Sequence, residues 1–528
     1  MHLREIFEDC LSETTKVEES TIDALILLIY NLTIGKWPLY ELNEWIQELN
    51  LNIIGIEKSR QSEQFTDDRF GRALDRFYMV DRASLMTRIV VEVTKVFNLD
   101  MTRLHNDSTS VKAFGDYPKP SRSGLAIHKG LSKDHRPDLK QLVYSLTISS
   151  DGAVPIHHKV YSGNRNDETT HIETWTTLSE ICQRPDFLYV ADCKLCTDKQ
   201  LSHITDLGGR VITVVPECWK ESKSFKEILR DSMKAKTEIF RKSNEYDEDI
   251  YYYAFNEEHY TECGKYRIHW ILSSDTRKED FKKRERLLVK AEKDLSKVLT
   301  QINKRNLKTR ESIQKKCEAI LKKRHVSRFI EIDVRDIVVE YTKTKKCKHK
   351  TRIQKVTKNE YTLSWKRRKN EIKREENLDG VFPLLTNDQM LTPKEVLVAY
   401  KYQPRLEKRF SQFKSIHNAA PLLFKKLERI EANMFLFFIS LMIQSLLERE
   451  IRNKMAEYKM EYLNVYPENR EATHPTANKI FDRFSQISAY ELMVGNDVIE
   501  RFQDPLSETH VKVLQMLNIA EESYWSRA

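Results

Sequence analysis

Three acidic residues stand where they could bind divalent metal ions. Asp107 lies in the segment HNDSTS, Asp192 follows the apolar run FLYVA, and Glu407 lies in the segment QPRLEKRFSQFK. Carboxylates gathered around one point repel each other unless cations neutralise them, so such a cluster predicts divalent metal. Mg²⁺, or Mn²⁺ in its place, prefers oxygen ligands. Two such ions can activate a water or a 3′-hydroxyl for attack at phosphorus.

Each of these acids also has a structural interpretation. A single Asp at a strand end is more often a helix cap or a turn former than a ligand, so spacing alone leaves both interpretations open. Cys193 and Cys196 form a CxxC, but the sequence has no second pair to complete a zinc site. We interpret these two cysteines as strand-end packing.

The predicted secondary structure would bring the acids together. Strands are predicted over 104–114, 141–149 and 154–161, with a hairpin turn at Asp151-Gly152, followed by a helix over 169–183, a strand over 187–191, a helix over 198–207 and a strand over 211–215. This order predicts a ribonuclease-H-like mixed α/β core. In such a sheet the first strand lies beside the strand that follows the first helix, so Asp107 and Asp192 would converge at the strand ends. A later helix can bring Glu407 over them.

A chain of 528 residues is too long for one ordinary core. We expect an N-terminal helical domain over 1–98, the first part of the core over 99–220, a basic insertion subdomain over 221–378, the second part of the core over 379–460, and a C-terminal helical region over 461–528. The α/β pattern stops after Pro216. Within the insertion, residues 277–325 predict a long helix or a helical hairpin, and residues 329–340 and 361–365 predict strands flanking basic loops.

The longest apolar run, from Met434 to Leu447, predicts a buried core helix. It has about fourteen residues, fewer than the roughly 20 that cross a bilayer. The N-terminal segment is acidic and lacks the apolar stretch of a signal peptide, and the eight cysteines are expected to be reduced thiols. We therefore expect no membrane partner and a cytoplasmic location.

Positive charge is concentrated in the middle of the chain. Residues 277–324 have 18 Lys/Arg and 7 Asp/Glu, a net charge of +11, and residues 343–374 have 14 and 2, a net charge of +12. Because the whole chain carries only +9, the remainder carries −14. A Lys-rich solvated helix face could explain the first block alone. Two adjacent basic blocks with interleaved aromatic residues instead predict contact with a phosphate backbone.

Several motifs share their order and spacing with a known family. They are HNDSTS at 105–110, GLSKDHRPD at 130–138 with Gln141, Gly163-Asn164 with Asp167, VADCKL at 190–195, DGVFPLLTN at 379–387 and YKYQPRLEKRFSQFK at 400–414. From about residue 67 to about residue 450 the chain resembles the transposases of insertion sequences, in the 1634-like group of the family numbered four. The resemblance implies a ribonuclease-H-like DDE transposase whose metal-binding triad is Asp107, Asp192 and Glu407. It also implies that the insertion between Asp192 and Glu407 contacts DNA and that the N-terminal helical domain over 1–98 binds the DNA ends. The expected location is the cytoplasm of a prokaryotic cell, in association with the nucleoid.

The family's signature around the glutamate is Tyr, Arg, Glu and Lys at fixed spacing. Here Tyr400, Glu407 and Lys414 fall in register, but Gln403 occupies the Arg position. Gln403 can hydrogen-bond a phosphate but carries no charge, so the part played by the Arg is in doubt. Pro404 favours a helix that begins there, which would leave Tyr400 and Gln403 on the preceding turn.

Further residues are predicted to contact DNA, and each has a structural alternative. Lys133 and Arg136 would add positive charge near the metal site, or form a polar turn before a strand. Trp365, flanked by Arg367 and Arg368, is the best candidate for stacking on a base, although a Trp is more often a core residue. Lys414 would meet a phosphate or face solvent.

The expected activity is cleavage at two transposon ends and joining of the freed 3′-hydroxyl to target DNA, by two-metal phosphoryl transfer. The expected partners are the terminal inverted repeats, the target DNA and a second copy of the chain. A non-catalytic DNA-binding protein derived from a transposase, or a nuclease acting on other nucleic acids, would share much of this pattern.

Overall fold

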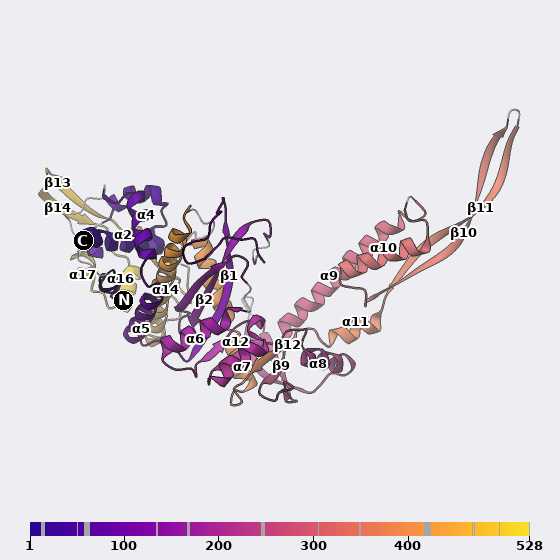
Figure 1. Cartoon of the computed structure of the whole chain (residues 1–528), viewed down its shortest axis with the longest axis horizontal. Coiled ribbons are helices and arrows are strands. Elements are labelled where there is room, and N and C mark those ends of the chain that lie inside the picture. Colours follow the sequence, from indigo (N-terminus) through magenta and orange to yellow (C-terminus); the bar gives the residue numbers. More distant parts are fainter. Residues whose placement is uncertain are drawn as a thin grey trace. The chain divides into compact units, whose positions relative to one another are not determined.

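The structure of this protein is a computed structural model, and the chain divides into two compact units. The first unit comprises residues 1–213 and 398–528, and the second comprises residues 214–397. The described residues are 1–11, 16–49, 51–56, 64–131, 133, 136–165, 169–243, 249–304, 306–347, 350–416, 424–466, 468, 470–495 and 497–526. Figure 1 labels the helices and strands of both units.

The N-terminal part of the first unit is helical, as its sequence indicates. Its α-helices are α1 (Leu3–Cys10), α2 (Lys16–Tyr30), α3 (Leu42–Gln47), α4 (Asp67–Tyr78) and α5 (Arg82–Phe97), with short 3-10 or π turns at Asn31–Gly35, Leu39–Glu41 and Leu51–Ile54. Helices α2 and α4 pack on α14 (Leu427–Glu457). Asp75 of α4 accepts hydrogen bonds of 2.9 and 2.8 Å from Arg429, which fixes α4 against the first turn of α14.

The sheet of the first unit follows the predicted order of elements. It is built from β1 (Arg103–Ala113), β2 (Lys140–Ser149), β3 (Pro155–Ser162), α6 (His171–Cys182), β4 (Leu188–Val190), α7 (Asp198–Asp206) and β5 (Arg210–Val214). The strand order is β3-β2-β1-β4-β5. Strands β1, β2 and β3 form an antiparallel meander, whereas β4 lies parallel to both β1 and β5. Strand β4 is wholly buried, which its uninterrupted apolar sequence predicts.

Helix α14 runs through the core of the first unit. It has 31 residues, and by length and composition alone it could cross a membrane, but 78% of its apolar window is buried inside the protein. Phe435 and Phe438 pack on the rings of Phe77 and His158. The burial supports the predicted core helix, which is longer than the apolar run because charged residues continue it at both ends. A shorter apolar pair of helical segments, residues 21–35 and 39–47, passes the same test only if its 107° bend is ignored.

The C-terminal region of the first unit contains strands as well as the predicted helices. Helices α15 (Ala477–Phe484), α16 (Glu508–Met516) and α17 (Glu521–Ser526) accompany a two-stranded hairpin of β13 (Ala489–Val494) and β14 (Asp497–Gln503). A separate cluster of buried residues joins the end of α14 to α15 and α16 through Ile451, Ile480 and Val513. The hairpin strands are short, and their sequence gave no strong signal.

The second unit contains a sheet that the sequence did not indicate. Its strands are β6 (Lys236–Ser243), β7 (Asp249–Phe255), β8 (His259–Tyr260), β9 (Arg267–Ser273) and β12 (Val381–Thr386), in the antiparallel order β12-β9-β7-β6 with β8 on β9. Helices α8 (Lys220–Asp231) and α11 (Lys369–Glu376) contact each other beside it. The α/β pattern was expected to stop after Pro216, and the strands predicted for the insertion lay only at 329–340 and 361–365. The strands over 236–273 were missed, and charged residues at the exposed positions of β6 mask its alternation.

The motif DGVFPLLTN has a structural role in the second unit. Its first residue, Asp379, accepts hydrogen bonds of 2.6 and 2.8 Å from the buried Arg284 guanidinium. Gly380 has φ +75°, and a Cβ there would lie 2.4 Å from the Ser273 carbonyl oxygen. The motif therefore joins the start of β12 to α9 (Ser274–Leu299) and the end of β9.

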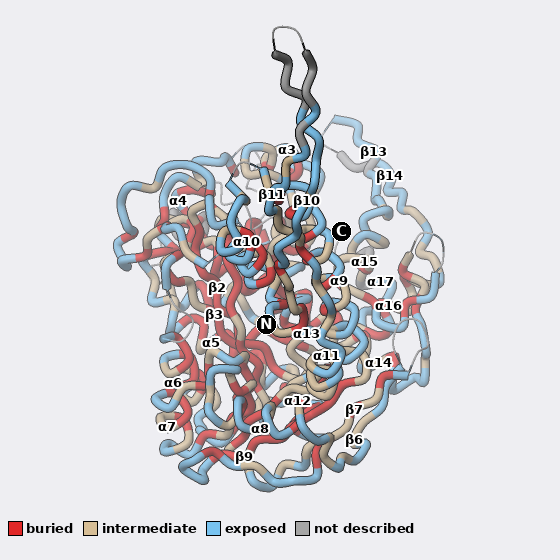
Figure 2. Tube along the Cα trace, turned by 90° about the vertical axis from the view of Figure 1, so that its right-hand side faces the viewer, coloured by how far each residue is buried: buried red, intermediate tan, exposed pale blue. Residues whose placement is uncertain are grey.

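A helical hairpin and a long β-ribbon complete the second unit. Helices α9 and α10 (Arg310–Lys323) confirm the predicted helical hairpin. The basic segments predicted to be loops are instead strands, since β10 (Ile330–Cys347) and β11 (Lys350–Arg367) pair antiparallel over their whole length. Lysines alternating with Thr, Val and Ile can form a solvated strand, a pattern that composition alone does not separate from a basic loop. Figure 2 shows that most of the described ribbon is exposed.

Candidate active site

Asp107 and Asp192 lie on neighbouring parallel strands of the first unit. Strand β1 pairs with β4 so that His105 stands opposite Val190. Asp107 and Asp192 each follow two residues later, so they occupy corresponding positions at the carboxyl end of β4, where neighbouring strands are about 4.8 Å apart. The negative charge of Asp192 acts on the Asp107 carboxyl. The structure thus brings together two of the three predicted acids.

Asp107 forms an ion pair with Lys133. Its Oδ1 atom lies 2.9 Å from the Lys133 ammonium nitrogen and 2.7 Å from the Ser108 backbone nitrogen. Only 25% of its side chain is exposed. Burial raises the pKa of the Asp107 carboxyl, Lys133 opposes the rise, and the charge of Asp192 adds to it. Such an acid pair is costly in its ionised form unless positive charge lies close to it.

The loop that carries Lys133 is fixed by three residues of the motif around it. Gly130 and Gly163 lie so close that a Cβ on Gly130 would stand 1.9 Å from the Gly163 carbonyl oxygen. The Gln141 side-chain nitrogen donates hydrogen bonds to Gly163 O (3.0 Å) and Leu131 O (3.2 Å). Because neither glycine has a side chain, the backbone at Gly130 can lie directly against Gly163 and Gln141. The Lys133 backbone nitrogen then donates to the Ser110 hydroxyl.

The segment from 400 to 416 is broken into three pieces rather than one helix. Tyr400 ends α12 (Pro393–Tyr400), Gln403 begins α13 (Gln403–Ser411) with Pro404 in its first turn, and Lys414 lies in a π turn (Gln412–Ile416). Pro404 explains the first break, since its fixed φ suits the start of a helix. The single stripe expected of one continuous helix is therefore absent. Glu407 is an exposed residue in the middle of α13.

Tyr400 links Glu407 to the acid pair. Burial, followed by the charges of Asp192, Cys193, Asp107 and Glu407, raises the pKa of the Tyr400 hydroxyl to about 12. The charges of all three predicted acids therefore act on the Tyr400 hydroxyl. The hydroxyl therefore keeps its proton at physiological pH and can donate a hydrogen bond.

Helix α13 begins directly on strand β1. The Gln403 side-chain nitrogen donates a hydrogen bond of 3.3 Å to the Asn106 carbonyl oxygen, and the Tyr402 ring packs on the buried His105 ring at 4.8 Å between centroids. Asp107 lies on the same face of β1 as His105, because side chains alternate along a strand. Gln403 therefore positions α13 on the side of the sheet where Asp107 points. Arg405, the nearest arginine, stacks on Tyr402 instead.

Sequence reasoning missed Arg409, the residue that fixes α13 in the core. Its guanidinium donates hydrogen bonds to the carbonyl oxygens of Gly152 and Ala153, both at 3.0 Å, and to Glu448 of α14 at 2.9 Å. The two charged side chains are only 5% and 3% exposed. Its place two residues after Glu407 in the motif was the one available signal.

The donor types of the three acids fit a hard divalent cation. Carboxylate oxygens are the ligands that Mg²⁺ and Mn²⁺ prefer, and the Lys133 ammonium stands on Asp107 where positive charge is needed. Among the residues whose placement is described, no group of three or more His, Cys, Asp or Glu lies close enough to hold a metal ion. Asp107 and Asp192 are thus neighbours, and Glu407 does not join them in a three-acid cluster among the described residues.

The other predicted DNA-contacting residues are distributed between the two units. In the first unit, Arg136 pairs with Asp138 in its own loop, with hydrogen bonds of 2.9 and 2.7 Å. In the second unit, Arg367 is held by Glu292 and Glu285 at 2.8 to 2.9 Å. Trp365 packs on the buried cluster of α9 and α10, as the core alternative predicts. Arg368 is exposed, with Glu331 at 3.7 Å. Trp365 thus packs on a buried cluster, and Arg136 and Arg367 form ion pairs within the protein.

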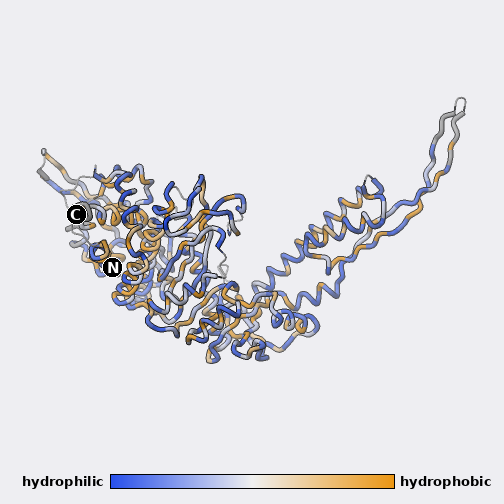
Figure 3. Tube along the Cα trace, in the orientation of Figure 1, coloured by the Kyte–Doolittle hydropathy of each residue, from blue (hydrophilic) through white to orange (hydrophobic). Residues whose placement is uncertain are grey.

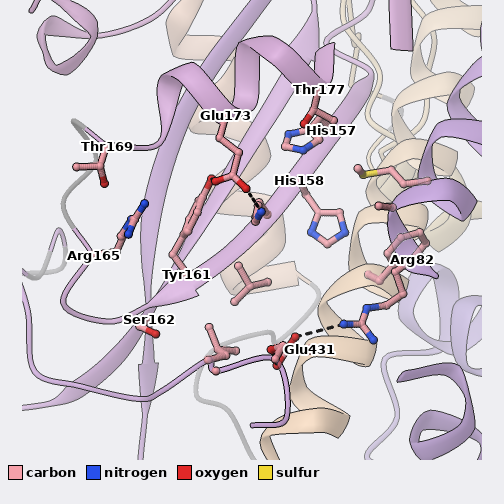
Figure 4. A pocket seen from close by; sticks show the side chains of 18 of the residues that line it. Arg82, His157, His158, Tyr161, Ser162, Arg165, Thr169, Glu173, Thr177 and Glu431 are labelled. Atoms are coloured by element: carbon pink, nitrogen blue, oxygen red, sulfur yellow. Dashed lines mark hydrogen bonds and ion pairs between the residues drawn. The ribbon is translucent and has the colours of Figure 1, made fainter. Parts of the chain in front are cut away.

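The first unit also contains a cavity whose lining includes none of the three predicted acids. It has a volume of about 870 Å³ and is lined by residues of α5, β3, α6 and α14. Figure 4 shows that the ends of Arg82 and Glu431 point toward each other inside it, joined by an ion pair of 3.3 Å. Lys159 likewise pairs with Glu173. His157 and His158 are buried, which lowers the pKa of His157 to about 4 and that of His158 well below its usual range. The two cations are thus held in ion pairs, and the two histidines are buried side chains whose lowered pKa favours the neutral form.

Comparison with known proteins gives limited matches. Residues 1–91 match a family described as "Domain of unknown function (DUF4277)". No curated protein matches the chain. Among solved structures, the chain is similar to a piggyBac transposase synaptic complex with hairpin DNA, at 11% sequence identity and a TM-score of 0.27. The alignment covers 52% of this chain and 58% of that one, so it spans a little over half of the solved chain.

Proposed function

We propose that this chain is a metal-dependent DNA transposase with a ribonuclease-H-like core, in which Asp107, Asp192 and Glu407 hold Mg²⁺. The observation that carries the proposal is the parallel register of β1 and β4, in which His105 stands opposite Val190, and Asp107 and Asp192 each follow two residues later. Motif spacing around Glu407 supports the third ligand. The substrate would be duplex DNA at the ends of the mobile element and at its target, and the assembly would contain two copies of the chain.

Each residue of the site has a part in this proposal. When bound, the metal ions supply Lewis acidity and lower the pKa of an attacking water or 3′-hydroxyl. Asp107 and Asp192 are held in place by backbone hydrogen bonds from Ser108 and Lys194. The protonated Tyr400 hydroxyl can donate to a phosphate oxygen, which a carboxylate could not do. Gln403 orients α13, so the charge that an Arg would supply must come from elsewhere.

A cleavage assay with purified full-length protein tests the proposal. The substrate is labelled duplex DNA that carries the terminal repeat of the element, incubated with Mg²⁺, with Mn²⁺, or with EDTA. We expect nicking at the end of the element, and joining of the 3′-hydroxyl to a second duplex, only when a divalent ion is present. Absence of both reactions in every condition would refute the proposal.

A second candidate function is DNA binding without catalysis. It is favoured by the lack of a ready-made three-acid cluster among the described residues and by Gln403 at the Arg position. This alternative predicts DNA binding that is indifferent to divalent ions and no effect of Mn²⁺ on protein stability. The assay above and a thermal melt in Mn²⁺ separate the two functions.

Replacing Lys133 by Met should increase the response of the protein to divalent ions. The ammonium neutralises Asp107, so a metal ion must compete with it for the carboxylate oxygen. We expect a larger rise in melting temperature on adding Mn²⁺ than in wild type, and half-maximal stabilisation at a lower Mn²⁺ concentration. Differential scanning calorimetry measures both quantities.

The matched control for this substitution is Lys129→Met. Lys129 is an exposed lysine on the same loop and has no contact with Asp107 among the described interactions. It should respond to Mn²⁺ as wild type does. Equal Mn²⁺ responses of Lys133→Met and wild type would show that the Lys133 ammonium does not compete with metal ions for the Asp107 carboxylate.

A further inference from the structure

The charge of the β10–β11 ribbon is divided sharply along its length. The half that adjoins α9 and α10 contains acids, and its basic residues are paired with them, as Arg335 is with Asp333 at 2.6 Å and Arg367 with Glu292. Residues 343–358, which we call the distal segment, contain eight Lys/Arg and no Asp or Glu. The basic residues of the near half are balanced by acids close to them. The distal segment has no acid of its own, although Lys358 at its end pairs with Glu360 of the near half at 2.8 Å.

The distal segment also lies beyond the hydrophobic contacts that hold the ribbon. Each strand has 18 residues, which corresponds to about 60 Å at about 3.3 Å per residue. The ribbon residues buried in the cluster of α9 and α10 are Ile330, Val334 and Leu363. Farther along, Val338 is 68% and Ile353 71% exposed. Figure 3 shows a mostly hydrophilic ribbon with isolated hydrophobic positions.

Lysines on an exposed strand have a simple alternative role. A charged edge prevents pairing with the strands of other molecules, and the exposed Val338 and Ile353 would otherwise favour such pairing. A few charges of either sign would be enough to prevent such pairing. Eight cations without one acid repel each other along a two-stranded ribbon, which has little stability alone. This arrangement is stabilised by a polyanion.

We propose that the distal segment lies in a groove of duplex DNA and grips the phosphate backbone without reading the sequence. A two-stranded ribbon fits the major groove, which is about 12 Å wide. Seven of the eight basic residues are Lys and one is Arg. Lysine acts as a point charge for phosphates, whereas bidentate reading of guanine is chiefly the role of arginine. The composition therefore points to positioning contacts.

This proposal relocates the DNA contact within the insertion. The sequence drew attention to Trp365 and Arg367, but both belong to the base of the ribbon and are engaged by α9 and α10. Lys343 and Lys355, in the distal segment, are exposed. The proposal depends on the proposed function only for the choice of DNA as the polyanion, since binding needs none of the three acids.

Salt-dependent binding of full-length protein to DNA tests the proposal. The probe is a fluorescein-labelled 30-base-pair duplex of arbitrary sequence in EDTA, where metal-dependent cleavage cannot occur. Each lost phosphate contact should reduce the slope of log K against log salt by about 0.9. For Lys343→Gln/Lys355→Gln we expect a slope reduced by about 1.8, which corresponds to an affinity about 60-fold lower at 0.1 M salt when the affinities at 1 M are equal.

A shortened ribbon is the second variant. Glu340 and Thr357 stand opposite each other, so an Asn-Gly turn in place of residues 341–356 closes the hairpin in register. It removes seven basic residues, and the slope should fall by up to about 6. The matched control is Lys290→Gln/Lys293→Gln on the exposed face of α9, which should bind as wild type does.

The outcomes separate this proposal from its alternatives. Unchanged slopes in both ribbon variants overturn it, as does a loss confined to one DNA sequence, because backbone contacts ignore sequence. Loss of binding to vesicles of phosphatidylserine and phosphatidylcholine, with duplex binding intact, would assign the segment to a membrane surface instead. Normal ribbon-dependent binding without any cleavage in Mg²⁺ would refute the proposed function and leave this inference standing.

Discussion

Asp192→Asn is expected to abolish strand cleavage and joining while leaving DNA binding intact. The substitution removes one negative charge from the acid pair but keeps the size of the side chain and the oxygen that accepts a hydrogen bond from Lys194 N at 3.0 Å. Loss of a metal ligand removes about 4 kcal/mol or more of transition-state stabilisation, which is about a thousandfold in rate. A single-turnover cleavage assay in Mg²⁺ measures the loss.

Two controls show whether this loss is specific. Asp198→Asn changes an exposed acid in the first turn of α7 that is not part of the Asp107–Asp192 pair. This variant should retain activity. Melting curves should show that Asp192→Asn is folded and that Mn²⁺ no longer raises its melting temperature as it does that of wild type. Cleavage by Asp192→Asn at the wild-type rate would remove Asp192 from the site.

Arg409→Ala is expected to lower the free energy of unfolding of the first unit by about 3–5 kcal/mol. Arg409 and Glu448 form an ion pair of 2.9 Å in the core, and removing the arginine leaves the buried carboxylate without its closest cation. The two carbonyl oxygens of the turn between β2 and β3 lose their donor as well. Urea unfolding followed by circular dichroism measures the effect.

Lys408→Ala is the control for this substitution, because Lys408 is exposed on the same helix. A surface substitution of this kind changes stability by no more than about 0.5 kcal/mol. Because Arg409 fixes α13, its loss should also slow cleavage by displacing Glu407, whereas Lys408→Ala should cleave normally. Wild-type stability of Arg409→Ala would show that α13 is held by other contacts.

The sequence by itself determined the first part of the sheet and the neighbourhood of two acids. The alternation in residues 141–149 and the uninterrupted apolar run at 187–191 predicted strands that the structure confirms. These patterns are local, because a strand that is covered on one or both faces shows it in its own residues. Once the order of elements was clear, the neighbouring positions of Asp107 and Asp192 followed.

Tertiary structure decided where the remaining candidates lie. Arg367 and Lys355 look alike in a basic segment, yet one is neutralised by two glutamates of α9 and the other is exposed. Arg409 and Lys408 are adjacent basic residues of α13, but Arg409 lies on the buried face of the helix and Lys408 on the exposed face. Charge and spacing do not record which acid, carbonyl or ring folds against a residue, since those partners come from segments up to hundreds of residues away. The contacts of Gln403 with β1 and of Lys133 with Asp107 depend on the same long-range packing.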